Sequence, residues 1–323
     1  MSGIVEWYRD LIDNRQDPRT EGWFLVSSPG PTLTIVATYI YFCVSAGPRY
    51  MKDKKPYDLK NTMIIYNFIQ ILLSLYLVHE GLLAEESRKD DGVYRNHVRN
   101  LKRFRSITDF NLSEIEKHIW KMTKGDISND QMARAVYTYF ICKLIELLDT
   151  VFFVMRKKDR QISFLHLYHH SMMPICAWIG IKFFAGGHPT LLGVINSFIH
   201  VFMYTYYMLA AFGPHMQKYL WWKRHLTTMQ IVQFIIIFFH NLQMLFTSCN
   251  FPKPLSFLLM LNSGLFIYMF GSFYVNNYVK SKNRRSETTK KSKTNGVVCI
   301  AANGSISVNG NSIFDEINNG KSD

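Results

Sequence analysis

Two segments decide the fold of this chain: KLIELLDT at residues 143–150 and HLYHH at residues 166–170. Both carry charged or imidazole side chains on an otherwise apolar background. A Lys, Glu or Asp at the centre of a membrane helix costs roughly 2.5–3.5 kcal/mol on insertion scales, so polar residues kept there are functional by default. The two segments therefore predict membrane helices that hold a polar site.

Working outward from these segments, apolar blocks alternate with short polar loops along the chain. Blocks of about twenty apolar residues match the thickness of a bilayer, so we predict seven membrane-spanning helices. They cover about residues 31–46, 62–84, 133–155, 163–184, 190–212, 226–249 and 255–279. The predicted fold class is an all-α, polytopic membrane protein.

The predicted spans form one domain at residues 31–279, between a polar head at 1–30 and a tail at 280–323. The tail is rich in Lys and Arg, then in Asn, Gly and Ser. We expect it to be disordered, because it lacks the apolar surface that would offset ordering entropy. Inside the domain, the polar segment 85–131 separates the second and third spans and contains ten Lys or Arg residues.

The net charge of +13 comes largely from basic residues in the short loops and the tail. Such loops are typical of the cytoplasmic side of a membrane, so we predict no nucleic-acid partner. Their alternation places the head in the lumen and the tail in the cytosol. A glycosylation sequon at Asn111 fits a lumenal segment, whereas the sequon at Asn303 lies in the predicted cytosolic tail and should stay bare.

The five cysteines are scattered without a CxxC pair and predict neither a disulfide framework nor a zinc site.

His166, His169 and His170 stand at positions i, i+3 and i+4, which share one face of a helix. Packing alone explains three imidazoles in one turn poorly, because burying polar groups without partners costs free energy. One interpretation is metal ligation, as in a membrane lipid oxidase or hydroxylase, although such sites use several histidine boxes and this chain has one. Another is acid–base or nucleophilic work on an acyl group, since a neutral imidazole can attack a thioester. A receptor or transporter also fits the span count but gives no reason for the cluster.

Further polar residues recur at helical spacing on the neighbouring spans. Lys143, Glu146 and Asp149 follow one stripe, which predicts an internal salt bridge, a network that orients the imidazoles, or both. The fifth and sixth spans carry polar side chains that either join helices or face a site, namely Asn196, His200, Tyr204, Tyr207, Gln230 and Gln233.

Taken together, these motifs resemble those of the very-long-chain fatty acid elongase (ELO) family. The chain has KxxExxDT at 143–150, HxxHH at 166–170, NxxHxxMYxYY at 196–207 and TxxQxxQ at 227–233. Their order and spacing agree with the family pattern, and the similarity covers about residues 15–280. It departs from the family in the segment 85–131, which is longer and more basic than usual.

The resemblance implies a 3-oxoacyl-CoA synthase of the endoplasmic reticulum membrane. Such enzymes condense a long-chain acyl-CoA with malonyl-CoA and release CO2 and CoA, without a cofactor or a metal ion. The implied fold has seven membrane helices, six of them forming an inverted barrel around an acyl tunnel. The implied partners are membrane lipids and the ketoreductase, dehydratase and enoyl reductase of the elongation cycle, and a homodimer is compatible with the family.

Site roles also follow from the resemblance, motif by motif. His169 would carry the acyl group as an acyl-imidazole, with His200 as its partner across the tunnel and His166 and His170 orienting it or moving protons. Substrate-binding roles would fall to Asn196, Tyr204, Tyr206, Tyr207, Gln230 and Gln233, supported by Lys143, Glu146 and Asp149. Basic residues at the cytosolic mouth would attract the CoA phosphates, although membrane topology explains them equally well: Arg156, Lys157, Lys158, Lys223 and Arg224.

Overall fold

The computed structural model of the chain describes residues 16–87, 129–186, 189–247 and 251–280. Within these ranges every regular element is a helix. The first fifteen residues, the segment 88–128 with Asn111, and the tail beyond residue 280 lie outside the described residues, so the expectations for them stay predictions.

Five helices among the described residues are long and apolar enough to cross a membrane. The first joins α2 (Pro29–Tyr41), the π-helix η3 (Phe42–Ala46) and α3 (Gly47–Met51) without interruption. The others are α4 (Lys60–Ser87), α10 (Pro189–Ala211), α11 (Lys223–Phe246) and α12 (Lys253–Tyr274), which continues into the π-helix η7 (Val275–Val279). These helices confirm the prediction of an all-α, polytopic membrane protein.

The third and fourth predicted spans are helical too, but they are not among these five: the third is divided into two shorter helices, and the fourth is less apolar. The third, predicted at about 133–155, is divided into α7 (Asn129–Ile145) and α8 (Leu148–Met155), a break that was not predicted from the sequence. At the break the backbone tightens, because the Leu147 and Asp149 N–H groups donate to carbonyls three residues earlier. The fourth span is α9 (Phe164–Phe183), which contains the histidine box.

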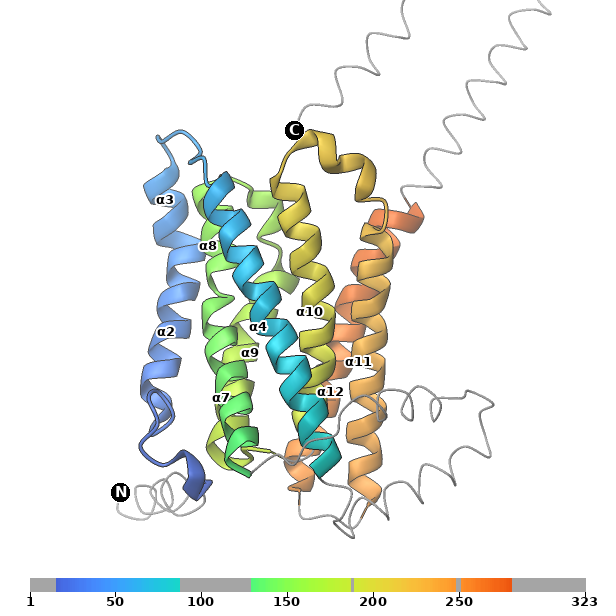
Figure 1. Cartoon of the computed structure of the whole chain (residues 1–323). Coiled ribbons are helices and arrows are strands. Elements are labelled where there is room, and N and C mark those ends of the chain that lie inside the picture. The colour runs from blue at the N-terminus through green and yellow to red at the C-terminus, as the bar shows by residue number, and fades with distance from the viewer. Residues whose placement is uncertain (1–15, 88–128, 187–188, 248–250, 281–323) are drawn as a thin grey trace, which may run out of the picture. The chain divides into compact units, whose positions relative to one another are not determined.

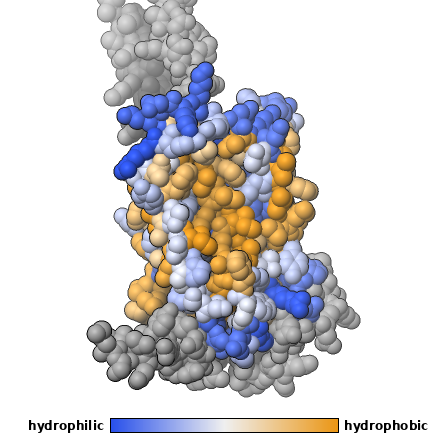
Figure 2. Space-filling view, turned by 90° about the vertical axis from the view of Figure 1, so that its left-hand side faces the viewer, coloured by the Kyte–Doolittle hydropathy of each residue, from blue (hydrophilic) through white to orange (hydrophobic). Residues whose placement is uncertain are grey.

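Close packing of helix on helix holds the part of the chain up to Phe270 together. α4 runs beside α10, α7 lies against α9 and α4, α2 lies against α9, and α10 contacts α11 (Figure 1). Gly81 shows how tight the α4–α10 contact is, since a Cβ atom there would overlap the Val194 side chain. On the side of α2, Figure 2 shows a broad field of exposed apolar residues. Along α2 and η3 the exposed side chains include Leu33 and Val44. Lipid is the environment that suits such a surface.

The residues before α2 are anchored on the last turn of α9. The short 3-10 helix η2 (Pro18–Thr20) follows Asp17, whose N–H donates to the Lys182 carbonyl at 2.9 Å. The Arg19 guanidinium binds the Asp17 carboxylate at 2.6 Å and donates to the Ala185 carbonyl at 2.8 Å. Burial works to raise the pKa of Asp17, but the hydrogen bonds and the charge of Arg19 outweigh it and leave this pKa below its ordinary value.

The remaining described elements are short connections. The 3-10 helix η5 (Asp159–Gln161) joins α8 to α9, and the 3-10 helix η6 (Pro214–Tyr219) joins α10 to α11. Ser163 caps α9, because its hydroxyl accepts a hydrogen bond from the His166 N–H. The cap starts the helix three residues before the first histidine and so sets the rotation of the whole box.

Candidate active site

The α7–α8 break carries a buried ion pair that reaches α10. The Lys143 ammonium donates to both Glu146 carboxylate oxygens, at 2.7 and 2.9 Å. His200 Nε2 lies 3.3 Å from Lys143 Nζ and 3.4 Å from Glu146 Oε2. All three side chains are buried. The predicted internal salt bridge is therefore present, and it includes the histidine that the sequence placed on the fifth span.

His200 keeps one ring nitrogen out of this network. Its Nδ1 atom is buried and has no hydrogen-bond partner in the described part of the chain. Lys143 has three ammonium protons, of which two go to Glu146 and the third can point at His200 Nε2. With Nε2 as the acceptor, the neutral ring holds its proton on Nδ1.

A second buried carboxylate, Asp149, is held by α10 rather than by a lysine. The Tyr204 hydroxyl donates to Asp149 Oδ2 at 3.0 Å, and Tyr204 is fully buried. The ring of Tyr66 on α4 packs edge-on against Tyr204, with 6.1 Å between the ring centroids. Gln70 in turn donates to the Tyr66 hydroxyl at 3.0 Å. Polar side chains from α4, α8 and α10 thus form one layer.

The histidine box of α9 stands next to this layer. His166 Nε2 lies 2.9 Å from the Thr150 hydroxyl, and the His166 and His170 rings are in contact, tilted by 42° with 4.2 Å between centroids. The His169 and His170 rings meet edge to face at 5.3 Å. His169 packs against Phe266 at 5.4 Å, and no hydrogen bond within the described ranges occupies its ring. The three imidazoles meet as the spacing predicts, and neither ring nitrogen of His169 forms a hydrogen bond within the described ranges.

The other predicted binding residues fall into two groups. Asn196 is buried and accepts a hydrogen bond from the Tyr139 hydroxyl at 3.2 Å. Gln230 has only a weak contact from its amide nitrogen to the Met203 sulfur at 3.8 Å, and Gln233 is buried nearby on the same helix. Tyr206 and Tyr207 pack in an aromatic cluster with Trp222 and Tyr204.

The predicted phosphate-binding residues do not form one cluster with the imidazoles. Arg156 donates to the Met63 sulfur at 2.9 Å, and Lys157 donates to the Lys52 carbonyl at 3.0 Å. The remaining three, Lys158, Lys223 and Arg224, are exposed.

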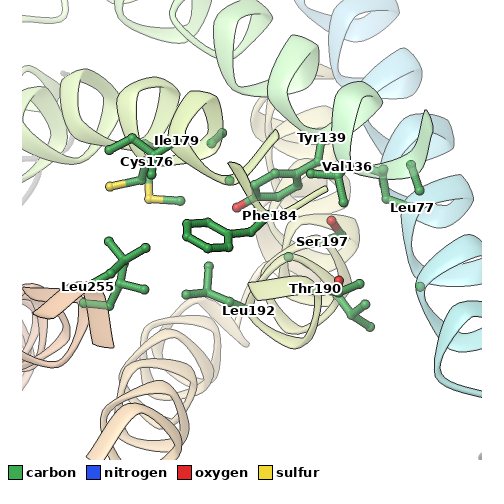
Figure 3. Close-up of a pocket in the computed structure, with 18 of the residues that line it drawn as sticks. Leu77, Val136, Tyr139, Cys176, Ile179, Phe184, Thr190, Leu192, Ser197 and Leu255 are labelled. Atoms are coloured by element: carbon green, nitrogen blue, oxygen red, sulfur yellow. The ribbon is translucent and has the colours of Figure 1, made fainter. Parts of the chain in front are cut away.

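An apolar cavity of about 110 Å³ lies among α4, α7, α9, α10 and α12 (Figure 3). Its wall includes Leu77, Tyr139, Cys176, Phe184 and Leu255. One water-sized group takes about 10–15 Å³ of such space, so the cavity has room for roughly seven to eleven of them. Since its lining is almost wholly apolar, it suits a hydrocarbon chain rather than a polar ligand.

The face of α9 that carries His169 leads into this cavity. Met173, Cys176 and Gly180 line the cavity at four, seven and eleven residues beyond His169, which is the spacing of one helical face. Met173 lies about 6 Å further along the helix axis than His169, at 1.5 Å per residue. The cavity therefore begins about one helical turn beyond His169, on the same face of α9.

The metal interpretation needs three or more ligands that converge. Among the residues described here, no group of three His, Cys, Asp or Glu side chains is placed to hold a metal ion. His166 contacts the Thr150 hydroxyl, His200 contacts Lys143 and Glu146, and the rings of the histidine box contact one another.

Several residues of the site were missed in the sequence. On α4 the buried residues Tyr66, Asn67, Gln70 and Ser74 share one face, and this polar stripe in an apolar span was a readable signal. Tyr39 and Tyr139 gave no such signal. A lone tyrosine is common in an apolar span, and only the packed structure shows which hydroxyl it meets.

Comparison with known proteins identifies the family of the chain. The model of the ELO family, described as the GNS1/SUR4 family, matches residues 24–286. A very long chain fatty acid elongase of Aedes aegypti is 38% identical over 288 residues, which cover 87% of this chain and 72% of that protein. Very long chain fatty acid elongase 7 of Drosophila melanogaster is 37% identical over 310 residues, covering 95% of this chain and 87% of its own. Human very long chain fatty acid elongase 1 is 35% identical over 309 residues, covering 94% and 100%.

Proposed function

Because the chain belongs to the ELO (GNS1/SUR4) family, it is a condensing enzyme of fatty acid elongation, and we propose that His169 carries the fatty acyl group during the reaction. The substrates are a long-chain acyl-CoA and malonyl-CoA, and the products are a 3-oxoacyl-CoA two carbons longer, CO2 and CoA. One observation carries the proposal: the His169 ring forms no hydrogen bond within the described residues, and Met173, one helical turn further along α9, lines the apolar cavity.

In the first step the His169 imidazole attacks the thioester carbon of the acyl-CoA. A C–N bond forms, the C–S bond breaks, and the CoA thiolate takes the proton that the ring gives up. The product is an acyl-imidazole, with the hydrocarbon chain in the cavity and CoA free to leave. Splitting one difficult transfer into two easier ones is the general advantage of a covalent intermediate.

In the second step malonyl-CoA loses CO2, and the electrons of the broken C–C bond form an enolate. The enolate carbon attacks the acyl carbonyl, the C–N bond breaks, and His169 takes a proton from solvent. His200 suits the enolate oxygen, because its buried Nδ1 has no other partner among the described residues. A preorganised donor aimed at developing negative charge is an oxyanion-type contribution. Asn196, Gln230 and Gln233 lie on the helices that flank this position.

The Lys143–Glu146 pair supports the chemistry indirectly, through His200. The Lys143 ammonium and the Glu146 carboxylate hold His200 in place and neutralise each other. In the same way the Asp149 carboxylate holds the Tyr204 side chain in place, by accepting a hydrogen bond from its hydroxyl. No step requires a cofactor or a metal ion, so we expect activity to survive chelating agents.

The protein is a multi-pass membrane protein, and we place it in the endoplasmic reticulum with its N-terminus in the lumen. In this topology α7–α8 and α9 also cross the membrane, which makes seven spans. The exposed residues Lys158, Lys223 and Arg224 then lie on the cytosolic side with the CoA substrates. The reductases and the dehydratase that process a 3-oxoacyl-CoA are the expected partners. Glycan mapped to Asn303 instead of Asn111 would invert this orientation.

The test uses purified protein in detergent with labelled malonyl-CoA and no added metal. Wild type should form a longer 3-oxoacyl-CoA, and His169→Ala should abolish the product while eluting as the same folded species. His225→Ala is the matched control, because His225 is exposed at the start of α11, and it should keep full activity.

Mass spectrometry then examines wild type incubated with acyl-CoA alone. We expect an acyl adduct on His169. An unmodified α9 peptide from a preparation that still makes product would refute the intermediate.

A further inference from the structure

Tyr39 links a peripheral helix to the histidine box. The sequence placed it in an ordinary apolar span, yet its side chain is only 6% exposed. Its hydroxyl lies 2.7 Å from the Thr150 hydroxyl, which lies 2.9 Å from His166 Nε2. A chain of hydrogen bonds therefore runs from α2 through α8 to α9.

The backbone around Tyr39 keeps this contact in register. The helix passes into the π-helix η3 three residues later, and π-bulges occur frequently at functional sites. At Gly47 the helix approaches α8 so closely that a Cβ atom would lie 2.7 Å from Val154 Cγ1. Tyr41, two residues after Tyr39, is 60% exposed instead. The close approach at Gly47 fixes which tyrosine of α2 faces α8.

The direction of the hydrogen bonds follows from counting donors. A tyrosine hydroxyl has one proton, and Thr150 is the one hydrogen-bond partner of Tyr39 in the described ranges. If that proton goes to Thr150, the Thr150 proton is left for His166 Nε2. Nε2 is then an acceptor, and the neutral ring must hold its own proton on Nδ1.

We propose that Tyr39 is a positioning residue that acts through Thr150 to hold His166 in one orientation and as its Nδ1–H tautomer. The consequence extends to the neighbouring imidazoles, because the His166 ring contacts the His170 ring at 4.2 Å and His170 meets His169 at 5.3 Å. The trio then presents a fixed arrangement of donors and acceptors to the thioester. The expected effect of Tyr39 on the rate of acyl transfer rests on the proposed function, whereas its expected effect on the His166 tautomer does not depend on that function.

The direct test is ¹⁵N nuclear magnetic resonance of the histidine-labelled protein in detergent, without substrate. The chemical shifts of the two ring nitrogens tell which one carries the proton, and a His166→Gln sample identifies the signals of His166. Wild type should show protonated Nδ1. Tyr39→Phe should show a mixture of tautomers, whereas Tyr41→Phe, the matched control on the same helix, should match wild type.

The second test is the single-turnover rate of acyl transfer to the enzyme. Tyr39→Phe and Thr150→Val should each lower it roughly two- to tenfold, the effect of losing a single hydrogen bond. Thr150→Ser keeps the hydroxyl and should restore the rate. The double variant should be no slower than Thr150→Val alone, because Tyr39 acts only through Thr150.

Unchanged His166 signals in Tyr39→Phe, or rate losses that simply multiply in the double variant, would overturn the proposal. Failure of the proposed function would give a different experimental result. In that case no acyl adduct would form on His169 in any variant, while the His166 tautomer would still respond to Tyr39→Phe.

Discussion

At the scale of single residues, the site contains charged side chains whose burial in a membrane protein costs free energy. Lys143 and Glu146 are 2% and 4% exposed and satisfy each other through two short hydrogen bonds. A buried pair of this kind is often no more stabilising than apolar residues of the same size, but breaking it leaves one charge without a partner. The pair is therefore better explained by its contact with His200 than by stability.

This explanation predicts strong coupling between the two residues. Glu146→Met should destabilise the protein by about 3–5 kcal/mol, because it leaves a buried ammonium alone. Lys143→Met should cost a similar amount, and the double variant much less than the sum, since neither charge remains. Thermal unfolding in detergent measures all three, with Lys158→Met as an exposed control. Additive losses would show that the two charges do not depend on each other.

At the scale of elements, close helix contacts position the polar side chains. The α4–α10 contact brings Tyr66 and Gln70 to the layer that holds Tyr204. The α7–α8 break tightens the backbone just where Lys143 and Glu146 meet. Short stretches with hydrogen bonds to the third residue often mark functional positions within a helix.

The α4–α10 contact leads to a prediction at Gly81. Gly81→Ala should destabilise the protein by about 1–3 kcal/mol, the usual cost of overpacking, because the new Cβ overlaps Val194. Adding Val194→Ala to the same chain should recover part of the loss by making room. Gly271→Ala is the control, since a Cβ there meets no atom within 4 Å. The unfolding temperature in detergent reports each case, and a Gly81→Ala protein as stable as wild type would contradict the packing argument.

At the scale of the whole molecule, the cavity is the feature that no single helix contains. Five helices contribute to its wall, and Phe184 and Cys176 project toward its space from the end of α9 and the helix itself (Figure 3). If the acyl chain lies here, the size of the cavity decides how long that chain can be. The sequence carries no local mark of this size.

Cys176→Phe should therefore shorten the longest acyl-CoA that the enzyme accepts. In an apolar pocket one methylene group is worth about 1–3 kcal/mol, so kcat/KM for the longest substrates should fall roughly ten- to two-hundredfold, with shorter ones little affected. Phe184→Ala should have the opposite effect and extend the products. Phe198→Ala is the control, because Phe198 is 48% exposed on α10. Equal losses for all chain lengths would mean that the cavity does not hold the acyl tail.

The site was predictable from the sequence wherever its residues share a helix. His166, His169 and His170 lie on one face because the helical repeat requires it, and the Lys143–Glu146 pair spans a single turn. Membrane helices were recognisable for the same reason, since an apolar run of bilayer length needs no distant partner to be understood. The break between α7 and α8, inside the span predicted at 133–155, was not predicted, because a local pattern does not show where the backbone of a helix tightens.

Contacts between helices depended on the tertiary structure. Tyr39 meets Thr150 across 111 positions of sequence, and Tyr66 reaches the Ile145 carbonyl across 79. The residues next to either tyrosine in the sequence do not predict its hydrogen-bond partner, because a hydroxyl can bond any acceptor that helix packing brings close to it. The sequence by itself determined that this protein is a membrane enzyme with an imidazole cluster. Packing alone decided which ring stays free, which ring is tied to α2, and how much space lies beyond His169.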